Sequence, residues 1–194
     1  KIKDKIFKFL EGLDVEDTDK LQAVSKRIQE LIVSTSMPND MAEEIMYTYE
    51  MLGSEKQKAT DLVEPKEVFV AVRSSATAED LPEASFAGQQ ATFLNVKGKE
   101  KVVSAVLACW ASLFTARAIY YRVKKKFDHS KVLISALVQK MVNAEKSGIM
   151  FTVNPSTNHD NEIVIEAIYG LGELIVGGEI NPDLYIVDKK KREI

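Results

Sequence analysis

The chain has 194 residues, 45% of them hydrophobic, which is enough to form the core of one substantial domain or two small ones. Its formal net charge is -3 at pH 7, whereas a protein whose main partner is nucleic acid needs a concentrated positive field, so no nucleic-acid partner is expected. Because no apolar run approaches the roughly 20 residues of a membrane span, no membrane partner is expected either, and the predicted location is the cytoplasm.

Residues 1–64 carry apolar side chains at helical spacing, which predicts a helical segment of three helices. The pattern breaks at residues 12–19 and again at residues 34–40. Four residues in these breaks can cap the helix that follows: Thr18, Asp19, Asn39 and Asp40. Nothing in this segment indicates a chemical role.

Residues 65–194 alternate between strand and helix patterns, which predicts an α+β region. Six strands are predicted, at residues 68–73, 91–96, 132–142, 149–153, 162–168 and 184–187. Between the second and third strands, residues 99–126 predict one long amphipathic helix. The single cysteine, Cys109, lies in this helix beside Trp110, and we expect a buried, unreactive thiol.

The apolar stripe of this predicted helix includes a cation, because Arg117 falls between Phe114 and Tyr121 at helical spacing. A guanidinium on the core side of a helix is costly unless an anion meets it. Alternatively, the aliphatic stem packs on the stripe while the charged end reaches water. The sequence leaves both interpretations of Arg117 open.

The stretch between the first two strands, residues 74–90, has neither helical nor strand periodicity. Loops of this length in compact domains are commonly lids or binding loops. Arg73 places a permanent cation at the end of the first strand, Ser74 and Ser75 follow with hydroxyls, and Gly88 lies in a small, flexible segment. These features suit a loop that grips phosphate. An ordinary polar surface loop is the alternative.

Acidic residues near the end of the chain are candidates for a metal site. Glu166 lies in an otherwise apolar strand, so it either meets a cation or lies at the solvent edge. Beside a triphosphate the natural partner is magnesium, which carboxylates and phosphate oxygens hold together. Glu173 and Glu179 are further candidates, although Glu173 could equally cap a helix or turn.

The sequence lacks the standard motifs of P-loop and dinucleotide-binding folds, and neither of its histidines has the surroundings of a catalytic base. The sequence contains no GxxxxGK[ST] segment, and the Gly170 and Gly172 pair is not continued by a third glycine at the dinucleotide-binding spacing. The two histidines, His129 and His159, have polar, loop-like neighbours, and each is predicted to be a solvated surface residue.

Five segments, taken in order, resemble the N-terminal ATP-binding domain of phosphoenolpyruvate synthases and pyruvate phosphate dikinases. They are VRSSATAEDLPEASFAGQQATFLNV (residues 72–96), SLFTARAIYYR (112–122), VQKMV (138–142), SGIMFTVNP (147–155) and EAIYGLGELIVGGEINPDLY (166–185). The resemblance thus covers most of the chain after about residue 66, and the helical first third is less distinctive.

The resemblance implies an ATP-grasp fold, in which ATP lies between two α+β subdomains, with ATP and Mg²⁺ as cofactors. By the matching motifs, Arg73 with its neighbours Ser74, Ser75 and Gly88 would contact the phosphates, and Arg117 would help to hold them. The backbone around Gln139 to Met141 would meet the adenine. The residues implied near the magnesium ion are Glu166 and Glu179.

In such enzymes ATP phosphorylates a histidine on a separate domain, which carries the phosphoryl group to pyruvate in a third domain. The products are AMP, phosphate and phosphoenolpyruvate. Neither histidine of this chain lies in the Gly- and Thr-rich context of the family's phosphohistidine, so no catalytic residue is expected here. The expected partners are therefore ATP and the phosphohistidine and pyruvate-binding domains of the same parent chain.

The chain is accordingly predicted to be a fragment of a larger multidomain enzyme, in which the family's Gly-rich, lysine-containing segment is expected ahead of Lys1. Two alternatives stay open at this point. One is a related dikinase or phosphotransferase that acts on pyruvate and phosphate, an antibiotic or a glucan. The other is a non-catalytic nucleotide-binding module.

Overall fold

The computed structural model describes residues 2–54, 67–76, 80–81, 84–85 and 91–194. These residues form a mixture of helices and antiparallel sheets, which confirms the predicted α+β class. They divide into two compact units, Lys1–Met141 and Val142–Ile194, each of which is described by itself. The predicted boundary between residues 64 and 65 lies outside the described residues.

The three predicted N-terminal helices are confirmed, but their caps differ from the prediction. They are α1 (Ile2–Leu10), α2 (Thr18–Val33) and α3 (Asn39–Gly53). The cap of α2 is Asp17, whose carboxylate accepts a hydrogen bond from the Lys20 amide at 3.1 Å. The cap position of α3 is Pro38, which has no side chain able to accept such a bond. Each predicted cap was therefore one or more residues too late.

The sheet of the first unit has the strand order β4-β1-β5 and is antiparallel throughout. Its strands are β1 (Val70–Ala76), β4 (Thr92–Val96) and β5 (Ile134–Lys140). Strand β1 extends three residues beyond the predicted end at Arg73. The predicted loop that follows also contains two very short paired strands, β2 (Asp80–Leu81) and β3 (Ala84–Ser85).

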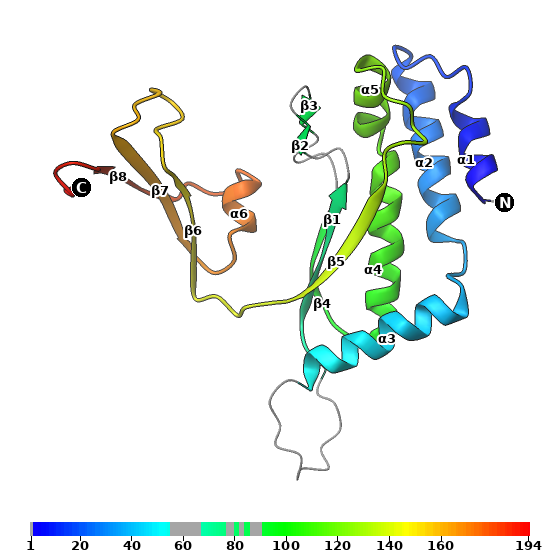
Figure 1. The fold of residues 1–194 in the computed structure, drawn as a ribbon, viewed down its shortest axis with the longest axis horizontal. Helices are drawn as coiled ribbons and strands as arrows, with labels where there is room; N and C mark the ends of the chain where they lie inside the picture. The colour runs from blue at the N-terminus through cyan, green and yellow to red at the C-terminus, as the bar shows by residue number, and fades with distance from the viewer. Residues whose placement is uncertain (1, 55–66, 77–79, 82–83, 86–90) are drawn as a thin grey trace, which may run out of the picture. The chain divides into compact units, whose positions relative to one another are not determined.

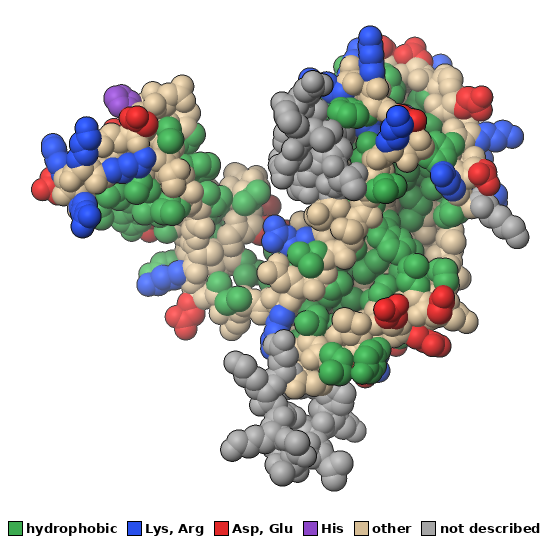
Figure 2. Space-filling view, viewed as in Figure 1, with side chains coloured by type: hydrophobic (Ala, Val, Ile, Leu, Met, Phe, Trp, Pro, Cys, Tyr) green, Lys and Arg blue, Asp and Glu red, His purple; other side chains and the backbone are tan. Residues whose placement is uncertain are grey.

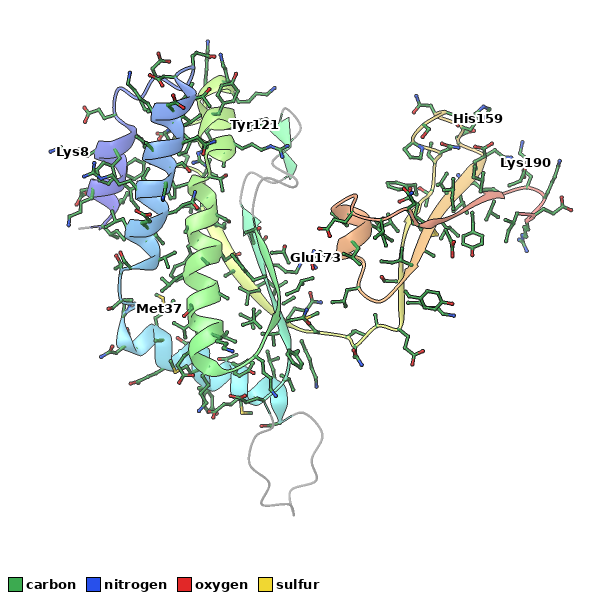
Figure 3. All side chains as sticks on the ribbon, turned by 180° about the vertical axis from the view of Figure 1, so that it is seen from behind. Lys8, Met37, Tyr121, His159, Glu173 and Lys190 are labelled. Carbon is green, nitrogen blue, oxygen red and sulfur yellow. The ribbon has the colours of Figure 1, made fainter. Side chains whose placement is uncertain are left out.

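One face of this sheet is covered by helices. Figure 1 shows β5 in front of α4 (Lys99–Ala111), and Figure 3, seen from behind, shows α4 in front of β5. The side chains of Val70 and Val72 on this face are fully buried, as is Cys109 of α4. The predicted buried thiol is thus confirmed, and burial raises the pKa of Cys109.

The predicted single helix over residues 99–126 is wrong. Helix α4 ends at Ala111, a short 3-10 turn follows at Ser112–Phe114, and α5 (Ala116–Lys124) begins after a bend of 40°. Thr115 has an extended backbone, and its hydroxyl oxygen accepts a hydrogen bond from the Ala118 amide at 3.2 Å, so it caps α5. Within the described residues, no single helix is long and apolar enough to cross a membrane, and only the bent α4–α5 pair meets that test together.

The second unit is built on the antiparallel sheet β6-β7-β8. Its elements are β6 (Lys146–Phe151), β7 (Glu162–Tyr169), α6 (Glu173–Val176) and β8 (Asp183–Asp188). A Cβ atom added to Gly148 would lie 2.5 Å from the backbone oxygen of Glu166, so only glycine permits the observed pairing of β6 with β7. Figure 2 shows hydrophobic side chains at the surface of this unit. Its exposed hydrophobic residues include Met150, Tyr169 and Leu184.

Candidate functional site

The β4-β1-β5 sheet exposes the face that α4 does not cover, here called the open face. Side chains alternate between the two faces of a strand, and directly paired residues share a face. Because β1 pairs Arg73 with Leu137 and Ser75 with Ser135, these four residues share the open face. The set that defines it is Phe69, Ala71, Arg73, Ser75, Thr92, Lys97, Ser135, Leu137, Gln139 and Met141.

Most side chains of the open face reach solvent, although the small Ala71 is only 7% exposed. Val70 and Val72, which alternate with them on the covered face, are fully buried. Phe69 is 51% exposed and Leu137 is 54% exposed, and Arg73 is also exposed. Four of the residues predicted from sequence to contact ATP therefore lie on one accessible surface: Arg73, Ser75, Gln139 and Met141. Their roles in binding stay predictions.

Arg73 is the cation of the open face. Its Nη1 atom lies 3.5 Å from Oε1 of Gln139, a long and weak hydrogen bond from the neighbouring strand. Among the described residues it forms no ion pair with a carboxylate. A guanidinium presents five donors, and among the described residues only this one weak hydrogen bond occupies them, which suits an anion such as a phosphate group.

The hydroxyls near Arg73 divide between the two faces. Ser75 and Ser135 lie opposite each other on the open face, where the Ser135 hydroxyl donates to the Ser75 backbone oxygen at 3.2 Å. Ser74 pairs with Ala136, so its side chain lies on the other, helix-covered face. Gly88, the remaining loop residue of the prediction, lies outside the described residues.

The other end of the open face is more apolar. The Met141 amide donates to the Phe69 backbone oxygen at 2.9 Å, which continues the ladder between β1 and β5. The Met141 sulfur accepts a hydrogen bond from the Asn95 amide at 3.0 Å. Lys97 places its ammonium nitrogen 5.4 Å from the centre of the Phe69 ring. An aromatic ring, a thioether and a cation thus gather where the predicted adenine contacts lie.

Arg117 lies elsewhere on the first unit, on α5, and its side chain is exposed. The prediction of one apolar stripe through Phe114, Arg117 and Tyr121 was wrong, because the bend at Thr115 separates Phe114 from α5. Arg117 and Tyr121 are one turn apart on α5, and Arg117 reaches solvent. Within the described part of the chain it has no hydrogen bond or ion pair. Its role with phosphate stays a prediction.

The buried cation of α5 is Arg122, which sequence reasoning missed. It is 1% exposed, and its Nε atom donates to Nδ1 of His129 at 2.9 Å, while its Nη1 and Nη2 atoms have no hydrogen-bond partner among the described residues. The Phe114 ring lies 5.4 Å from its Cζ atom. Counting from the cap at Thr115 would have found it, since the buried face of α5 is Ala118, Ile119 and Arg122.

His129 is a half-buried acceptor rather than the solvated residue that was predicted. Burial, together with the charge of Arg122, lowers the pKa of His129 to about 4, and burial lowers the pKa of Arg122 to about 10. At neutral pH the imidazole is therefore uncharged and accepts through Nδ1. His159 is exposed as predicted, in the β6–β7 connection (Figure 3).

The candidate metal ligands lie in the second unit. Glu166 is half-buried on the central strand β7, where it pairs with Ile149 and Leu184, and no described cation forms an ion pair with it. Glu179 is exposed just after α6, and Glu173 is exposed in its first turn. The described residues contain no group of three or more His, Cys, Asp or Glu side chains placed to hold a metal ion.

These carboxylates fit magnesium only in a limited sense. Mg²⁺ prefers hard oxygen ligands, and one or two carboxylates with phosphate oxygens and water are a common set. Glu166 and Glu179 supply oxygens of that kind, whereas a cage made by the protein alone would need more ligands than the described residues bring together. The residues present thus fit an ion that arrives with a phosphate group.

Comparison with known proteins identifies the family. The family model for the pyruvate phosphate dikinase AMP/ATP-binding domain matches residues 1–194, the whole chain. The chain is 56% identical over 191 residues to a probable phosphoenolpyruvate synthase of Methanocaldococcus jannaschii, covering 98% of this chain. It is 54% identical over 188 residues to the phosphoenolpyruvate synthase of Pyrococcus furiosus, covering 97%.

A bacterial protein, the phosphoenolpyruvate synthase of Helicobacter pylori, is 48% identical over 193 residues and matches 98% of this chain. The chain spans only 16%, 22% and 23% of the length of these three proteins. The resemblance inferred from the five sequence segments is thereby confirmed. The chain belongs to the pyruvate phosphate dikinase AMP/ATP-binding domain family.

Proposed function

We propose that this chain is the ATP-binding part of a phosphoenolpyruvate synthase with an ATP-grasp fold. The observation that carries the proposal is the open face, where the strand register brings Arg73, Ser75, Gln139 and Met141 onto one exposed surface. Relatives that match nearly the whole chain carry the name phosphoenolpyruvate synthase, which supports the same conclusion. The acceptor chemistry belongs to parts of such an enzyme beyond this chain.

In the proposed reaction, ATP phosphorylates a histidine on another domain, and the phosphohistidine then phosphorylates pyruvate. The products are phosphoenolpyruvate, AMP and phosphate. Dividing the transfer through a covalent intermediate allows two distant sites to share one phosphoryl group. The residues of this chain bind and orient the nucleotide, and they supply neither the phosphohistidine nor the pyruvate site.

Each proposed residue contributes by charge or by shape. Arg73 would donate to phosphate oxygens from the open face, and Arg117 would add a second positive charge. Glu166 and Glu179 would hold a magnesium ion that neutralises part of the phosphate charge. Met141 and the backbone beside it would contact the adenine. Positioning and electrostatic stabilisation are the main requirements of phosphoryl transfer, so these roles suffice for a nucleotide-binding domain.

Calorimetry with MgATP tests the proposal in this chain and in the protein encoded by the complete reading frame that contains it. Arg73→Ala is expected to weaken ATP binding at least tenfold, because a charge-assisted hydrogen bond contributes about 1.5 to 3 kcal/mol. Lys101→Ala is the matched control, since it removes one exposed positive charge from α4 on the covered side of the sheet.

The complete protein should also form AMP from ATP in the presence of pyruvate. Absence of MgATP binding in both proteins would contradict the proposal. So would equal binding by the wild type and Arg73→Ala, because the open face would then not be the nucleotide site. AMP formation that requires a different acceptor would keep the binding role and replace pyruvate in the proposed reaction.

A further inference from the structure

The open face has two chemically different ends. Strand β4 pairs Val96 with Val70, which makes Lys97 the neighbour of Phe69, and the Met141 amide bonds to Phe69 from the other side. One row across the sheet is therefore Lys97, Phe69 and Met141. Arg73 lies four residues farther along the chain, about 13 Å away at the rise of an extended strand. That separation is comparable to the length of an extended nucleoside triphosphate.

Phe69 presents an aromatic ring at the surface of this sheet. It is 51% exposed, although the adjacent Val70 is fully buried. The Lys97 ammonium nitrogen lies over its ring, 5.4 Å from the ring centre. A half-exposed ring beside an exposed strand surface presents a flat apolar face, and every nucleobase can stack on such a face.

Hydrogen-bond donors gather at the opposite end. Arg73 shares its row with Thr92 of β4, and the next row contains Ser75 and Ser135. Their guanidinium and hydroxyl groups suit phosphate oxygens. Lys97 is less suited to that task, because its ammonium already lies over an aromatic ring. The distribution of donors thus favours one direction for a bound nucleotide.

We propose that Phe69 is the residue on which the nucleotide base stacks, with the triphosphate directed along β1 toward Arg73. This inference rests on the proposed ATP binding, which already has the adenine near Met141 and the phosphates at Arg73, and adds to it the side chain that recognises the base. The base would stack on the ring of Phe69 beside Met141. Because the Lys97 ammonium lies over the Phe69 ring, the base would stack only on the part of the ring that Lys97 does not cover.

The test compares two ligands, MgATP and inorganic tripolyphosphate with magnesium, which lacks the base. Calorimetry is carried out on the protein encoded by the complete reading frame. Phe69→Ala is expected to weaken MgATP binding about tenfold, in the lower part of the range for base stacking on an aromatic side chain, and to leave tripolyphosphate binding unchanged. Arg73→Ala is expected to weaken the binding of both ligands.

Two further variants separate stacking from loss of fold. Phe69→Tyr keeps an aromatic ring and should bind MgATP with wild-type affinity. Phe69→Leu keeps apolar volume without a ring, so its loss of MgATP affinity should be nearly as large as that of Phe69→Ala. Tyr47→Ala is the matched control, because it removes a 64% exposed aromatic ring from α3. It should bind both ligands as the wild type does.

The outcomes distinguish this inference from the proposed function. If the wild type binds MgATP and Phe69→Ala binds it equally well, base stacking on Phe69 is wrong while the proposed function stands. If Phe69→Ala weakens both ligands equally, the residue acts at the phosphates or through the fold, and the proposed direction is wrong. If the wild type binds neither ligand, the proposed function fails and this inference fails with it.

Discussion

The buried contact between Arg122 and His129 predicts how the stability of the first unit depends on one imidazole. Replacing His129 with leucine removes the hydrogen-bond acceptor of the Arg122 Nε atom, which lies 2.9 Å from Nδ1. The guanidinium is 1% exposed, and its other two nitrogens have no hydrogen-bond partner among the described residues. Because a buried hydrogen bond to a charged group contributes about 1.5 to 3 kcal/mol, His129→Leu should lower the free energy of unfolding by about 2 kcal/mol at pH 7.5.

The same contact gives the stability a defined pH dependence. The folded protein lowers the pKa of His129 from 6.5 to about 4, so the fold favours the neutral imidazole. This contribution is fully present above pH 6.5 and is lost as the pH falls from 6.5 toward 4. A shift of that size corresponds to at most about 3 kcal/mol, and the partial exposure of His129 reduces the expected contribution to on the order of 1 to 2 kcal/mol.

Urea unfolding followed by the fluorescence of the single tryptophan, Trp110, measures both effects. The stability difference between the wild type and His129→Leu should be about 2 kcal/mol at pH 7.5 and smaller at pH 5.0. Comparing the two proteins at each pH cancels the titration of the carboxylates, which they share. His159→Leu is the control, because that histidine is exposed, and it should unfold as the wild type does at both pH values.

A double variant tests the physical cause. Arg122→Met combined with His129→Leu replaces both polar partners by apolar side chains, so it should recover most of the stability lost by His129→Leu alone. The reasoning is refuted if His129→Leu is as stable as the wild type at pH 7.5, or if the stability difference is the same at pH 7.5 and pH 5.0. It is also refuted if the double variant is less stable than His129→Leu.

Three further substitutions have expected costs. Gly148→Ala places a Cβ atom 2.5 Å from the Glu166 backbone oxygen, which should weaken the pairing of β6 with β7. Hydrogen exchange should therefore become faster at the amides of β6 and β7 but not at those of α4, and unchanged exchange in β6 would contradict this expectation. Tyr49→Phe removes a buried hydroxyl that donates to the Val68 oxygen at 2.8 Å and accepts from the Gly98 amide at 3.0 Å, and urea unfolding should show a loss of about 1 to 3 kcal/mol. Thr115→Ala removes the cap of α5 and should cost about 1 kcal/mol, whereas Thr115→Ser should cost little, and equal stability of the two variants would argue against the cap.

Much of the fold could be predicted because the apolar residues of most helices and strands recur at the spacing of that element. The three N-terminal helices and the principal strands were each located within a few residues of their observed positions. The bend between α4 and α5 could not be read this way, since the apolar spacing continues across it. The bend depends instead on one residue, Thr115, whose extended backbone and capping hydroxyl interrupt a helix that its neighbours would continue.

The site was predictable as a set of residues but not as a surface. Arg73 and Gln139 are separated by 66 residues in sequence, and only the pairing of β1 with β5 brings them together. The assignment of Ser74 depended on where β1 ends. A strand that stops at Arg73 leaves the next two serines equivalent, whereas a strand that continues to Ala76 sends Ser74 and Ser75 to opposite faces.

The buried polar pair was missed for a related reason. A helix drawn without the bend puts Arg117 on the apolar side, whereas the observed α5 exposes Arg117 and buries Arg122. His129 is seven residues after Arg122, in a loop with polar neighbours, and its burial comes from contacts that the loop sequence does not reveal. Tertiary packing thus determined both assignments.

The role of the open face as the nucleotide site is tested most directly by an NMR titration of the 194-residue chain with MgATP, following the backbone amide signals. If the open face is the nucleotide site, the largest signal changes should fall in β1 and β5 and at Phe69 just before β1, among them Arg73, Ser75 and Gln139, with little change in α1 and α2. It would be contradicted if MgATP bound while these signals stayed in place and the largest changes fell in the N-terminal helices.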